Sequence, residues 1–125
     1  MVLGKTVIGV SALVLISYGL VSLVNPAIPS GFAGLEMSNG DAFAEVGAMY
    51  GGLQTGLGIF CLLALQKPDF YSACLALLAL AFGTLALARL YSSLMATDAV
   101  TAYTYSAFVF EFAISILATA AFLKK

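Results

Sequence analysis

The chain has no histidine, few charged residues and no run of lysines or arginines. Without histidine it lacks the commonest protein metal ligand, haem ligation through an imidazole, and the usual acid–base group near neutral pH. Nucleic-acid binding depends on clustered cations, so a formal net charge of −1 without a basic run argues against it. We therefore expect neither a histidine-based metal or haem site nor a nucleic-acid partner.

The small number of charged residues also indicates whether the protein is surrounded by water or by lipid. Charged residues make up 9% of the sequence and hydrophobic residues 62%, against about 25% and about 45–50% in ordinary soluble domains. A water-soluble domain of 125 residues could not bury so much apolar surface. Two cysteines, Cys61 and Cys74, fall in apolar surroundings and are interpreted as small buried hydrophobes. The composition predicts one domain embedded in a lipid bilayer.

Sequence motifs of common enzymes are missing as well. The chain contains no Ser-His-Asp set, no CxxC, no phosphate-binding loop with its lysine and no carboxylate array with metal-ligand spacing. We therefore predict no catalytic residue, no metal site and no cofactor. Glu45 and Glu111 have the chemistry of an acid and a base, but nothing in their spacing demands that role.

What the chain does have is apolar stretches near the ~20 residues that cross a hydrocarbon core. They cover residues 5–24, 42–65, 70–96 and 101–123. A secretory signal is the competing interpretation of the first stretch, but the apolar part of a signal runs only about 7–15 residues. Since the chain begins at Met1, we expect no leader to have been removed. The prediction is an all-α integral membrane protein, an antiparallel four-helix transmembrane bundle forming a single domain over residues 1–125.

Turn and cap residues mark the connections between these stretches. Pro26 and Pro29 predict the end of the first helix, and Asp41 is expected to cap the second. The connection after the second stretch is short, which favours an antiparallel hairpin, and Pro68 either ends one helix or opens the next.

The basic residues indicate an orientation. Four spans place Lys5, Lys67, Lys124 and Lys125 on one side of the membrane. The other two connections contain no Lys or Arg but carry Glu36, Asp41 and Asp98. By the positive-inside rule, we predict that both termini are cytoplasmic.

Three ionisable residues, Glu45, Arg89 and Glu111, fall inside the apolar stretches. The topology places all of them in the outer half of the bilayer, Arg89 about 10 Å and Glu111 about 15 Å from the ends of their spans. An unpaired charge near mid-span costs at least ~2.5–3.5 kcal/mol. Arginine cannot lose its charge, whereas a glutamate can take up a proton. We therefore predict that Arg89 pairs with one or both glutamates.

Polar and small residues surround these charges. We predict a polar patch toward the outer side of the bundle, made of Glu45, Tyr50, Gln54, Arg89, Ser92, Glu111 and Ser115. Glycines are predicted to let helices pack closely at Gly47, Gly51, Gly52, Gly56 and Gly58. Two interpretations stay open. The patch either joins helices through one ion pair, or it is a functional pocket, since intramembrane ionisable residues mark such sites.

Short motifs run along essentially the whole chain. They are Asn25-Pro26-Ala27, Tyr50-Gly51-Gly52, Gly56-Leu57-Gly58, Arg89-Leu90 and Glu111, spread over the four stretches and the first connection. With these motifs the chain resembles a bacterial family of small four-span membrane proteins known as domain of unknown function 4345 (DUF4345). The resemblance implies a four-span protein of a bacterial inner membrane and names no activity. The layout is more loosely similar to DoxX-like proteins, some of which are linked to quinone-dependent oxidoreductases.

Three functions fit these features. The first is an accessory subunit or small-ligand binder that holds a lipid, a quinone, another polar head group or a partner helix in the polar patch. The second is a small oligomeric transporter or channel in which a glutamate gains and loses protons beside Arg89. The third is a quinone-linked oxidoreductase subunit in which Arg89 and Tyr50 hydrogen-bond a quinone carbonyl. The apolar inner half of the last stretch argues against the second, and the lack of histidine argues against the third. The first therefore leads, with a homo-oligomer or a larger membrane complex as its setting.

Overall fold

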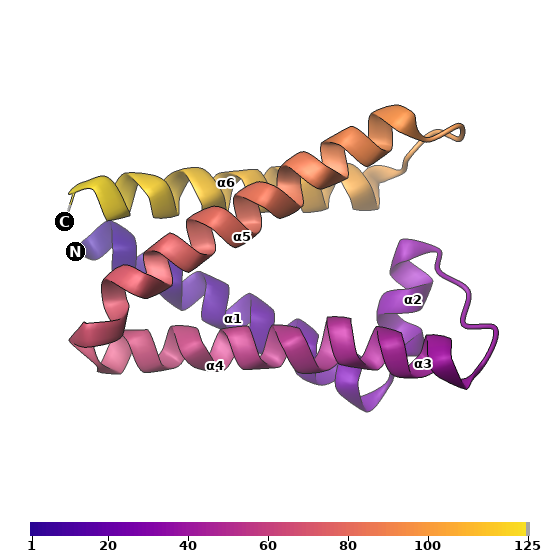
Figure 1. Ribbon diagram of the computed structural model, residues 1–125, viewed down its shortest axis with the longest axis horizontal. Helices are drawn as coiled ribbons and strands as arrows, with labels where there is room; N and C mark the ends of the chain where they lie inside the picture. Colours follow the sequence, from indigo (N-terminus) through magenta and orange to yellow (C-terminus); the bar gives the residue numbers. More distant parts are fainter. Residues whose placement is uncertain (125) are drawn as a thin grey trace. The chain divides into compact units, whose positions relative to one another are not determined.

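The computed structural model describes residues 1–124, which form helices joined by short connections (Figure 1). The helices are α1 (Val2–Val24), α2 (Ala27–Ala33), α3 (Gly40–Val46), η1 (Gly47–Gly52), α4 (Leu53–Gln66), α5 (Pro68–Met95) and α6 (Ala102–Lys124). Helical stretches long and apolar enough to cross a membrane are Val2–Val24, Gly40–Gln66, Pro68–Met95 and Ala102–Lys124. The all-α prediction with four candidate spans is confirmed, and the described residues contain no β-strand.

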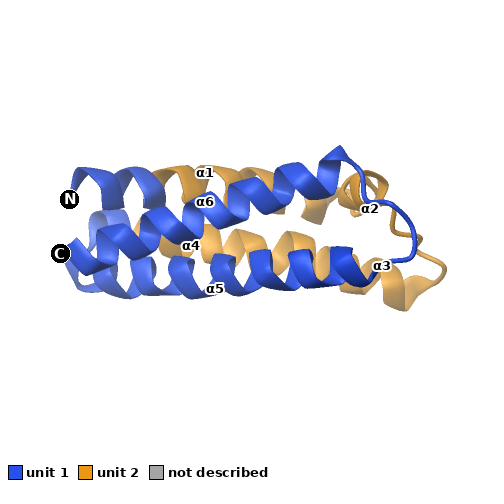
Figure 2. Ribbon diagram, turned by 90° about the horizontal axis from the view of Figure 1, so that it is seen from above, with its two compact units in different colours: residues 1–8, 64–125 blue, residues 9–63 orange. Residues whose placement is uncertain are grey.

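The helices divide into two compact units (Figure 2). Unit 1 holds residues 1–8 and 64–125, and unit 2 holds residues 9–63. Unit 1 therefore contains α5, α6 and the first turns of α1, while unit 2 contains most of α1 and α4 together with α2, α3 and η1. The single domain expected from the chain length stays a prediction.

In unit 1, α5 and α6 run antiparallel and meet along apolar faces. The buried residues of these faces recur every three or four positions, as one side of a helix requires. They are Leu75, Leu78, Phe82 and Ala86 on α5, with Ile114, Ala118 and Ala121 on α6. The ring of Phe82 meets that of Phe110 edge to face, with 6.0 Å between centroids. Pro68 takes the second of its two predicted roles and opens α5.

Gly83 of α5 lies against the side chain of Ser115 of α6. The Ser115 hydroxyl donates a hydrogen bond across the helix pair to the carbonyl oxygen of Ala79, at 2.8 Å. A Cβ atom on Gly83 would lie 2.7 Å from Ser115 Oγ, so a larger residue would push the hydroxyl aside. Ser115 therefore serves packing between α5 and α6.

The lysines of unit 1 gather at one of its ends. The start of α1, the α4–α5 connection and the end of α6 all lie there (Figure 2), and Tyr71 Oη donates to the Met1 carbonyl oxygen at 3.5 Å. These segments carry Lys5, Lys67 and Lys124, whereas the connection between α5 and α6 carries Asp98 and no cation. The uneven distribution of lysines on which the predicted orientation depends is thus present within unit 1. Which side of the membrane this lysine-bearing end faces stays a prediction.

The connection after α1 differs from the predicted proline-interrupted loop, because it contains α2. Pro29 lies in the first turn of this short helix, where a missing N–H leaves no internal hydrogen bond unmade. Gly34 ends α2 with φ 70°, a left-handed conformation that favours glycine. A proline early in a helix is compatible with helix formation. Pro26 therefore follows the end of α1, and Pro29 is accommodated in the first turn of α2.

The predicted cap of the second span is wrong by two residues. Asn39, not Asp41, is the N-cap of α3, and its side-chain oxygen accepts a hydrogen bond from Ala42 N at 2.9 Å. Asp41 lies in the first turn, where its carboxylate still faces the positive end of the helix dipole. Asn and Asp cap helices about equally well, so the local sequence alone does not choose between them.

A π-helical turn, η1, interrupts the second span at its glycines. The Leu53 N–H bonds to the carbonyl oxygen of Ala48, five residues earlier. Within unit 2, a Cβ atom on Gly51 would lie 2.8 Å from both N and Cα of Leu23, and one on Gly58 would lie 3.0 Å from the Ile16 nitrogen. α1 therefore passes close to the backbone of this span at two levels.

The remaining glycines predicted to pack helices have more space. A Cβ atom on Gly47 would lie 3.6 Å from the Pro26 ring, an ordinary contact. At Gly52 and Gly56 it would meet no described atom within 4 Å. The five glycines therefore differ in their surroundings. Gly51 and Gly58 have a close backbone neighbour, Gly47 has an ordinary contact, and Gly52 and Gly56 have no neighbour within 4 Å among the described atoms.

This difference predicts opposite outcomes for neighbouring substitutions. Gly51→Ala should destabilise the protein, because relieving the contact with Leu23 requires backbone movement, and overpacking costs about 1–3 kcal/mol. Gly52→Ala should be neutral or stabilising, since alanine is favoured over glycine in a helix by roughly 0.5–1 kcal/mol. The midpoints of thermal unfolding in detergent measure both. Equal midpoints would contradict the close approach of α1 at Gly51.

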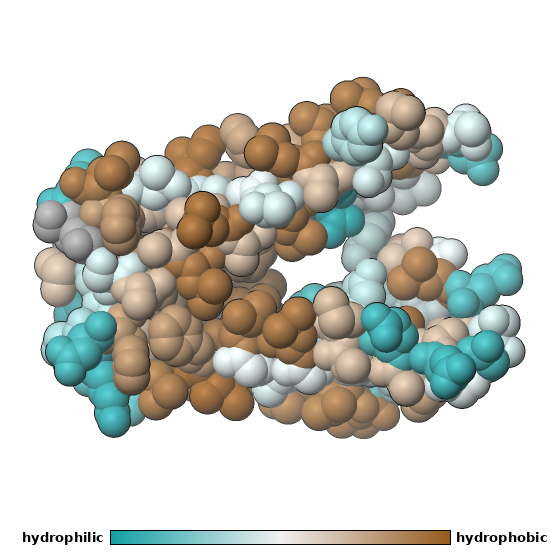
Figure 3. Space-filling model, viewed as in Figure 1, coloured by the Kyte–Doolittle hydropathy of each residue, from teal (hydrophilic) through white to brown (hydrophobic). Residues whose placement is uncertain are grey.

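Hydrophobic side chains cover most of the face drawn in Figure 3, and strongly hydrophilic ones gather mainly toward helix ends on that face. Large apolar residues are exposed on every candidate span, among them Leu13, Leu62, Leu80 and Val109. Contiguous apolar surface on this scale is rare in soluble monomers but normal against lipid tails. The four candidate spans therefore indicate a multi-pass membrane protein in contact with the bilayer.

Candidate functional site

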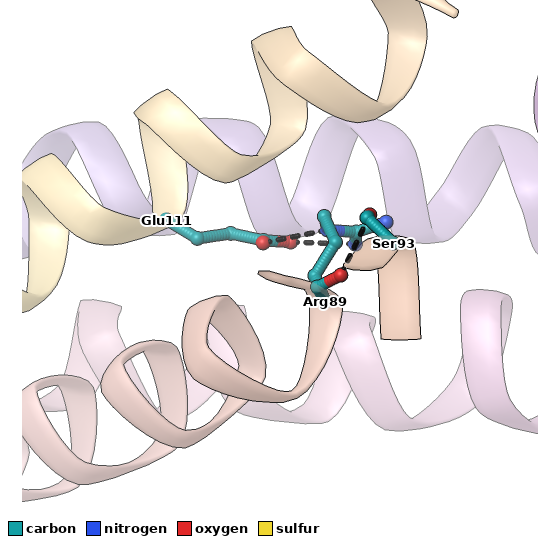
Figure 4. A network of polar contacts seen from close by, with 3 residues as sticks. All are labelled: Arg89, Ser93 and Glu111. Carbon is teal, nitrogen blue, oxygen red and sulfur yellow. Dashed lines mark hydrogen bonds and ion pairs between the residues drawn. The ribbon is translucent and has the colours of Figure 1, made fainter. Parts of the chain in front are cut away.

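Arg89 of α5 and Glu111 of α6 form a bidentate ion pair (Figure 4). Arg89 Nε donates to Glu111 Oε1 at 2.8 Å, and Nη2 donates to Oε2 at 2.7 Å. The side chain of Glu111 is 7% exposed and that of Arg89 25%. The predicted buried ion pair is thus confirmed for Glu111. Two parallel charge-assisted hydrogen bonds fix the plane of the guanidinium as well as its position.

The antiparallel hairpin brings these two residues to the same level. Arg89 precedes the end of α5 by about 9 Å, and Glu111 follows the start of α6 by about 14 Å, at the usual helical rise. One turn beyond Arg89, the Ser93 hydroxyl donates to the Arg89 carbonyl oxygen at 2.7 Å. This bond joins the Ser93 side chain to the backbone of α5 and does not involve the guanidinium of Arg89.

An open pocket of about 370 Å³ lies beside the ion pair, between the end of α5 and the start of α6. Half of the residues that line it are apolar and half are polar. They are Leu85, Ala88, Ala96 and Val100, with Arg89, Ser92, Ser93 and Thr104. Arg89 thus both pairs with Glu111 and forms part of the pocket wall.

Tyrosines on the same hairpin indicate where the pocket lies in a membrane. Tyr91 of α5 is 66% exposed and Tyr105 of α6 is 62% exposed, each about one turn from the α5–α6 connection. Exposed tyrosines are enriched at the boundary between head groups and hydrocarbon. The length of α5, about 42 Å, also matches the ~40–45 Å of a bilayer with its head groups. Both observations favour a pocket at that boundary.

The chain matches the protein family described as Domain of unknown function (DUF4345) over residues 3–122. It belongs to the DUF4345 family. This confirms the resemblance based on the glycine motifs, Arg89-Leu90 and Glu111, and it carries no activity with it. Neither the curated proteins nor the solved structures contain a match. The looser similarity to DoxX-like proteins and the bacterial origin stay expectations.

The predicted polar patch of this DUF4345 chain is spread over both units. Unit 1 contains Arg89, Ser92, Glu111 and Ser115. Three of these belong to the pocket or its ion pair, because Ser92 lines the pocket wall beside Arg89. Ser115 bonds to Ala79 instead and does not line the pocket.

The other predicted members, Glu45, Tyr50 and Gln54, belong to unit 2, so their grouping with Arg89 stays a prediction. Glu45 is exposed and lies about 8 Å from the start of α3. At that depth a flexible carboxylate can reach the head groups, so it does not require a buried partner. The DUF4345 chain can therefore tolerate Glu45 whether or not Arg89 is near it.

Sequence reasoning left several pocket residues out of the predicted patch. Leu85 and Ala88 on α5 and Ala96 at its C-cap recur at helical spacing with Arg89 and Ser92, so one face of the helix could have been extended from the arginine. Val100 could not be found in this way, because its place depends on the path of the connection after α5. The pocket of this DUF4345 protein is thus formed by one face of α5, the connection after it and the first turn of α6.

The side chains that most often bind metal ions are dispersed in the part of the chain that the structure describes. Residues 1–124 contain no group of three or more His, Cys, Asp or Glu side chains close enough to hold an ion. Cys61 and Cys74 are both buried.

Proposed function

We propose that this protein is a non-enzymatic binder of a membrane amphiphile, whose polar head lies in the pocket between α5 and α6. The observation that carries the proposal is the mixed pocket wall beside a fixed ion pair. The hydroxyls and the guanidinium of the wall suit a polar head, and Leu85 and Ala88, which lie deeper on α5, suit the first carbons of its chains. An ion pair that only joined helices would not need one partner exposed to an open pocket.

The size and depth of the pocket support the same ligand class. About 370 Å³ is at the lower end of the ~300–1,000 Å³ of known ligand sites, so it suits a head group and not a whole lipid. The pocket extends from Ala96, directly after the end of α5, to Leu85, about 16 Å deeper along the helix. An amphiphile in the bilayer places its head and its first carbons across this same range of depth. The tails of the ligand would then stay among the lipids.

The localisation belongs to this proposal. The resemblance to a bacterial four-span family and the lysines at one end of unit 1 support an inner-membrane protein with both termini cytoplasmic. The pocket then opens toward the outer leaflet. A homo-oligomer or a larger membrane complex is compatible with this arrangement.

Hydrogen bonding below Glu111 favours binding over transport. The Ser115 hydroxyl donates to Ala79 O, and the Thr119 hydroxyl donates to Ser115 O at 2.8 Å. These are the hydroxyls of α6 below the ion pair, and both are occupied by backbone carbonyls. The donor hydrogens of both hydroxyls are therefore used within unit 1, which favours a packing role for them over a role in a transport path.

Filling the pocket tests the proposal. Ala88 and Ala81 are both exposed on α5, but only Ala88 lines the pocket. Ala88→Phe should reduce retention of a co-purified amphiphile at least about tenfold, since losing 1.4 kcal/mol of binding free energy already has that effect. Ala81→Phe, two turns deeper, should leave retention unchanged. Native mass spectrometry of the two variants and the parent, each extracted in mild detergent, measures the retained ligand. Equal retention by all three would contradict the proposed function.

A further inference from the structure

We infer that the pocket selects an amphiphile with an uncharged, oxygen-bearing head over one with an anionic head. This inference rests on the proposed function and narrows it to a ligand class. Three features carry it: the engagement of Arg89 by Glu111, the other charges of the hairpin, and the hydroxyls of the pocket wall.

Arg89 already has a carboxylate in bidentate contact. Both Glu111 oxygens accept from the guanidinium, at 2.8 Å and 2.7 Å. An anionic head that took this place would have to displace a carboxylate that α6 holds beside the arginine. It would also leave Glu111, whose side chain is 7% exposed, without these two bonds. The arginine is thus poorly available to a second anion at the position of Glu111.

The other charges near the pocket repel an anion. Between Phe70 and Leu123 the charged residues are Arg89, Asp98 and Glu111. Asp98 is exposed in the connection between Ala96 and Val100, and both of these neighbours line the pocket. The hairpin around the pocket therefore carries one cation and two anions. A phosphate or carboxylate head would gain no net attraction from unit 1 at this end.

The hydroxyls of the wall suit a neutral head. Ser92 of α5 and Thr104 of α6 line the pocket from two different helices, and each hydroxyl can donate one hydrogen bond and accept others. The Ser93 hydroxyl donates to Arg89 O, so its oxygen remains an acceptor facing the same pocket. This set fits carbonyl and hydroxyl oxygens. Two sources in a membrane carry that chemistry, the ester and hydroxyl groups of a diacylglycerol and the carbonyls of a quinone.

Two ligands that share their glycerol and acyl chains, one with a free hydroxyl and one with a phosphate in its place, test the inference. The delipidated full chain in detergent is offered dioleoylglycerol and dioleoyl phosphatidate in equal amounts, and native mass spectrometry measures the bound fraction of each. The expected result is at least fivefold more bound diacylglycerol. A quinone with an isoprenoid tail, added in a third arm, identifies which neutral source binds better. Equal or preferred binding of phosphatidate would overturn the inference, and Ala88→Phe would still decide separately whether the pocket binds amphiphiles at all.

A charge change outside the helices provides a second measurement. Asp98→Asn removes one negative charge beside the pocket at an exposed position and should raise phosphatidate binding on the order of threefold relative to diacylglycerol. Asp69→Asn removes the same charge at the opposite end of α5 and should leave the ratio unchanged. A ratio that stays the same in Asp98→Asn would show that charge does not set the preference, and the inference would be wrong. If neither ligand binds and Ala88→Phe retains what the parent retains, the proposed function itself fails.

Discussion

Replacing Arg89 with Leu should destabilise the protein by about 3–5 kcal/mol, because it leaves a buried carboxylate without its bidentate partner. Glu111→Leu should have an effect of similar size, since the arginine cannot lose its charge. In both variants the remaining group is held by its helix inside a candidate span. Chemical unfolding in detergent measures the free energy for each variant against the parent.

The double substitution, Arg89→Leu with Glu111→Leu, should recover most of that loss. Replacing a buried ion pair by well-packed apolar residues is often neutral or stabilising, even though removing one partner is costly. A double-mutant cycle gives the coupling between the two side chains directly. Losses that simply add would contradict a coupled pair.

The same double variant separates the two interpretations of the ion pair. If the pair serves only to join α5 and α6, the double variant should fold and retain any bound amphiphile. If Arg89 also forms the wall of a ligand site, the double variant should fold and bind at least about tenfold less. Our proposal requires the second result, and unchanged retention would assign the pair to helix packing alone.

The spans were predictable because the bilayer imposes one simple rule on a sequence. Every backbone polar group in the hydrocarbon must be bonded within its own helix, so long apolar stretches become helices whatever their residue propensities. The ends and irregular turns follow from other causes. Asn39 rather than Asp41 caps α3, and η1 forms where Gly51 lies against α1, a tertiary contact. Neither the choice of cap nor the π-helical turn can be predicted from the hydropathy of the chain.

The ion pair was also predictable, since a guanidinium at that depth requires a carboxylate and the topology brings Glu111 to its level. The sequence could not choose between Glu45 and Glu111 by that argument, because the predicted topology places both glutamates in the same half of the bilayer. The structure shows the bond to Glu111 and leaves Glu45 exposed. The pocket beside Arg89 depends further on how the α5–α6 connection folds, and no local pattern in residues 96–101 specifies that path.

A lysine placed at the centre of α5 should be far more damaging than one placed near its end. Leu80 and Leu94 are equally accessible, at 72% and 75% exposed, and both lie on α5. Leu80 is about 18 Å from the start of the helix, close to the middle of the bilayer. Leu80→Lys should therefore cost at least ~2.5–3.5 kcal/mol and sharply reduce the amount of folded protein in the membrane. Leu94→Lys can extend its ammonium into the head groups and should behave like the parent.

Yield after membrane extraction and the unfolding midpoint in lipid nanodiscs measure both variants. In a protein surrounded by water, two exposed leucines on one helix would tolerate lysine equally well, since surface substitutions usually change stability by less than about 0.5 kcal/mol. The difference in yield and unfolding midpoint between the two variants therefore depends on how deep each position of α5 lies in the bilayer and not on its packing. Equal behaviour of Leu80→Lys and Leu94→Lys would mean that the exposed apolar surface does not face hydrocarbon. The pocket at Arg89 would then lose the bilayer boundary on which its amphiphile ligand depends.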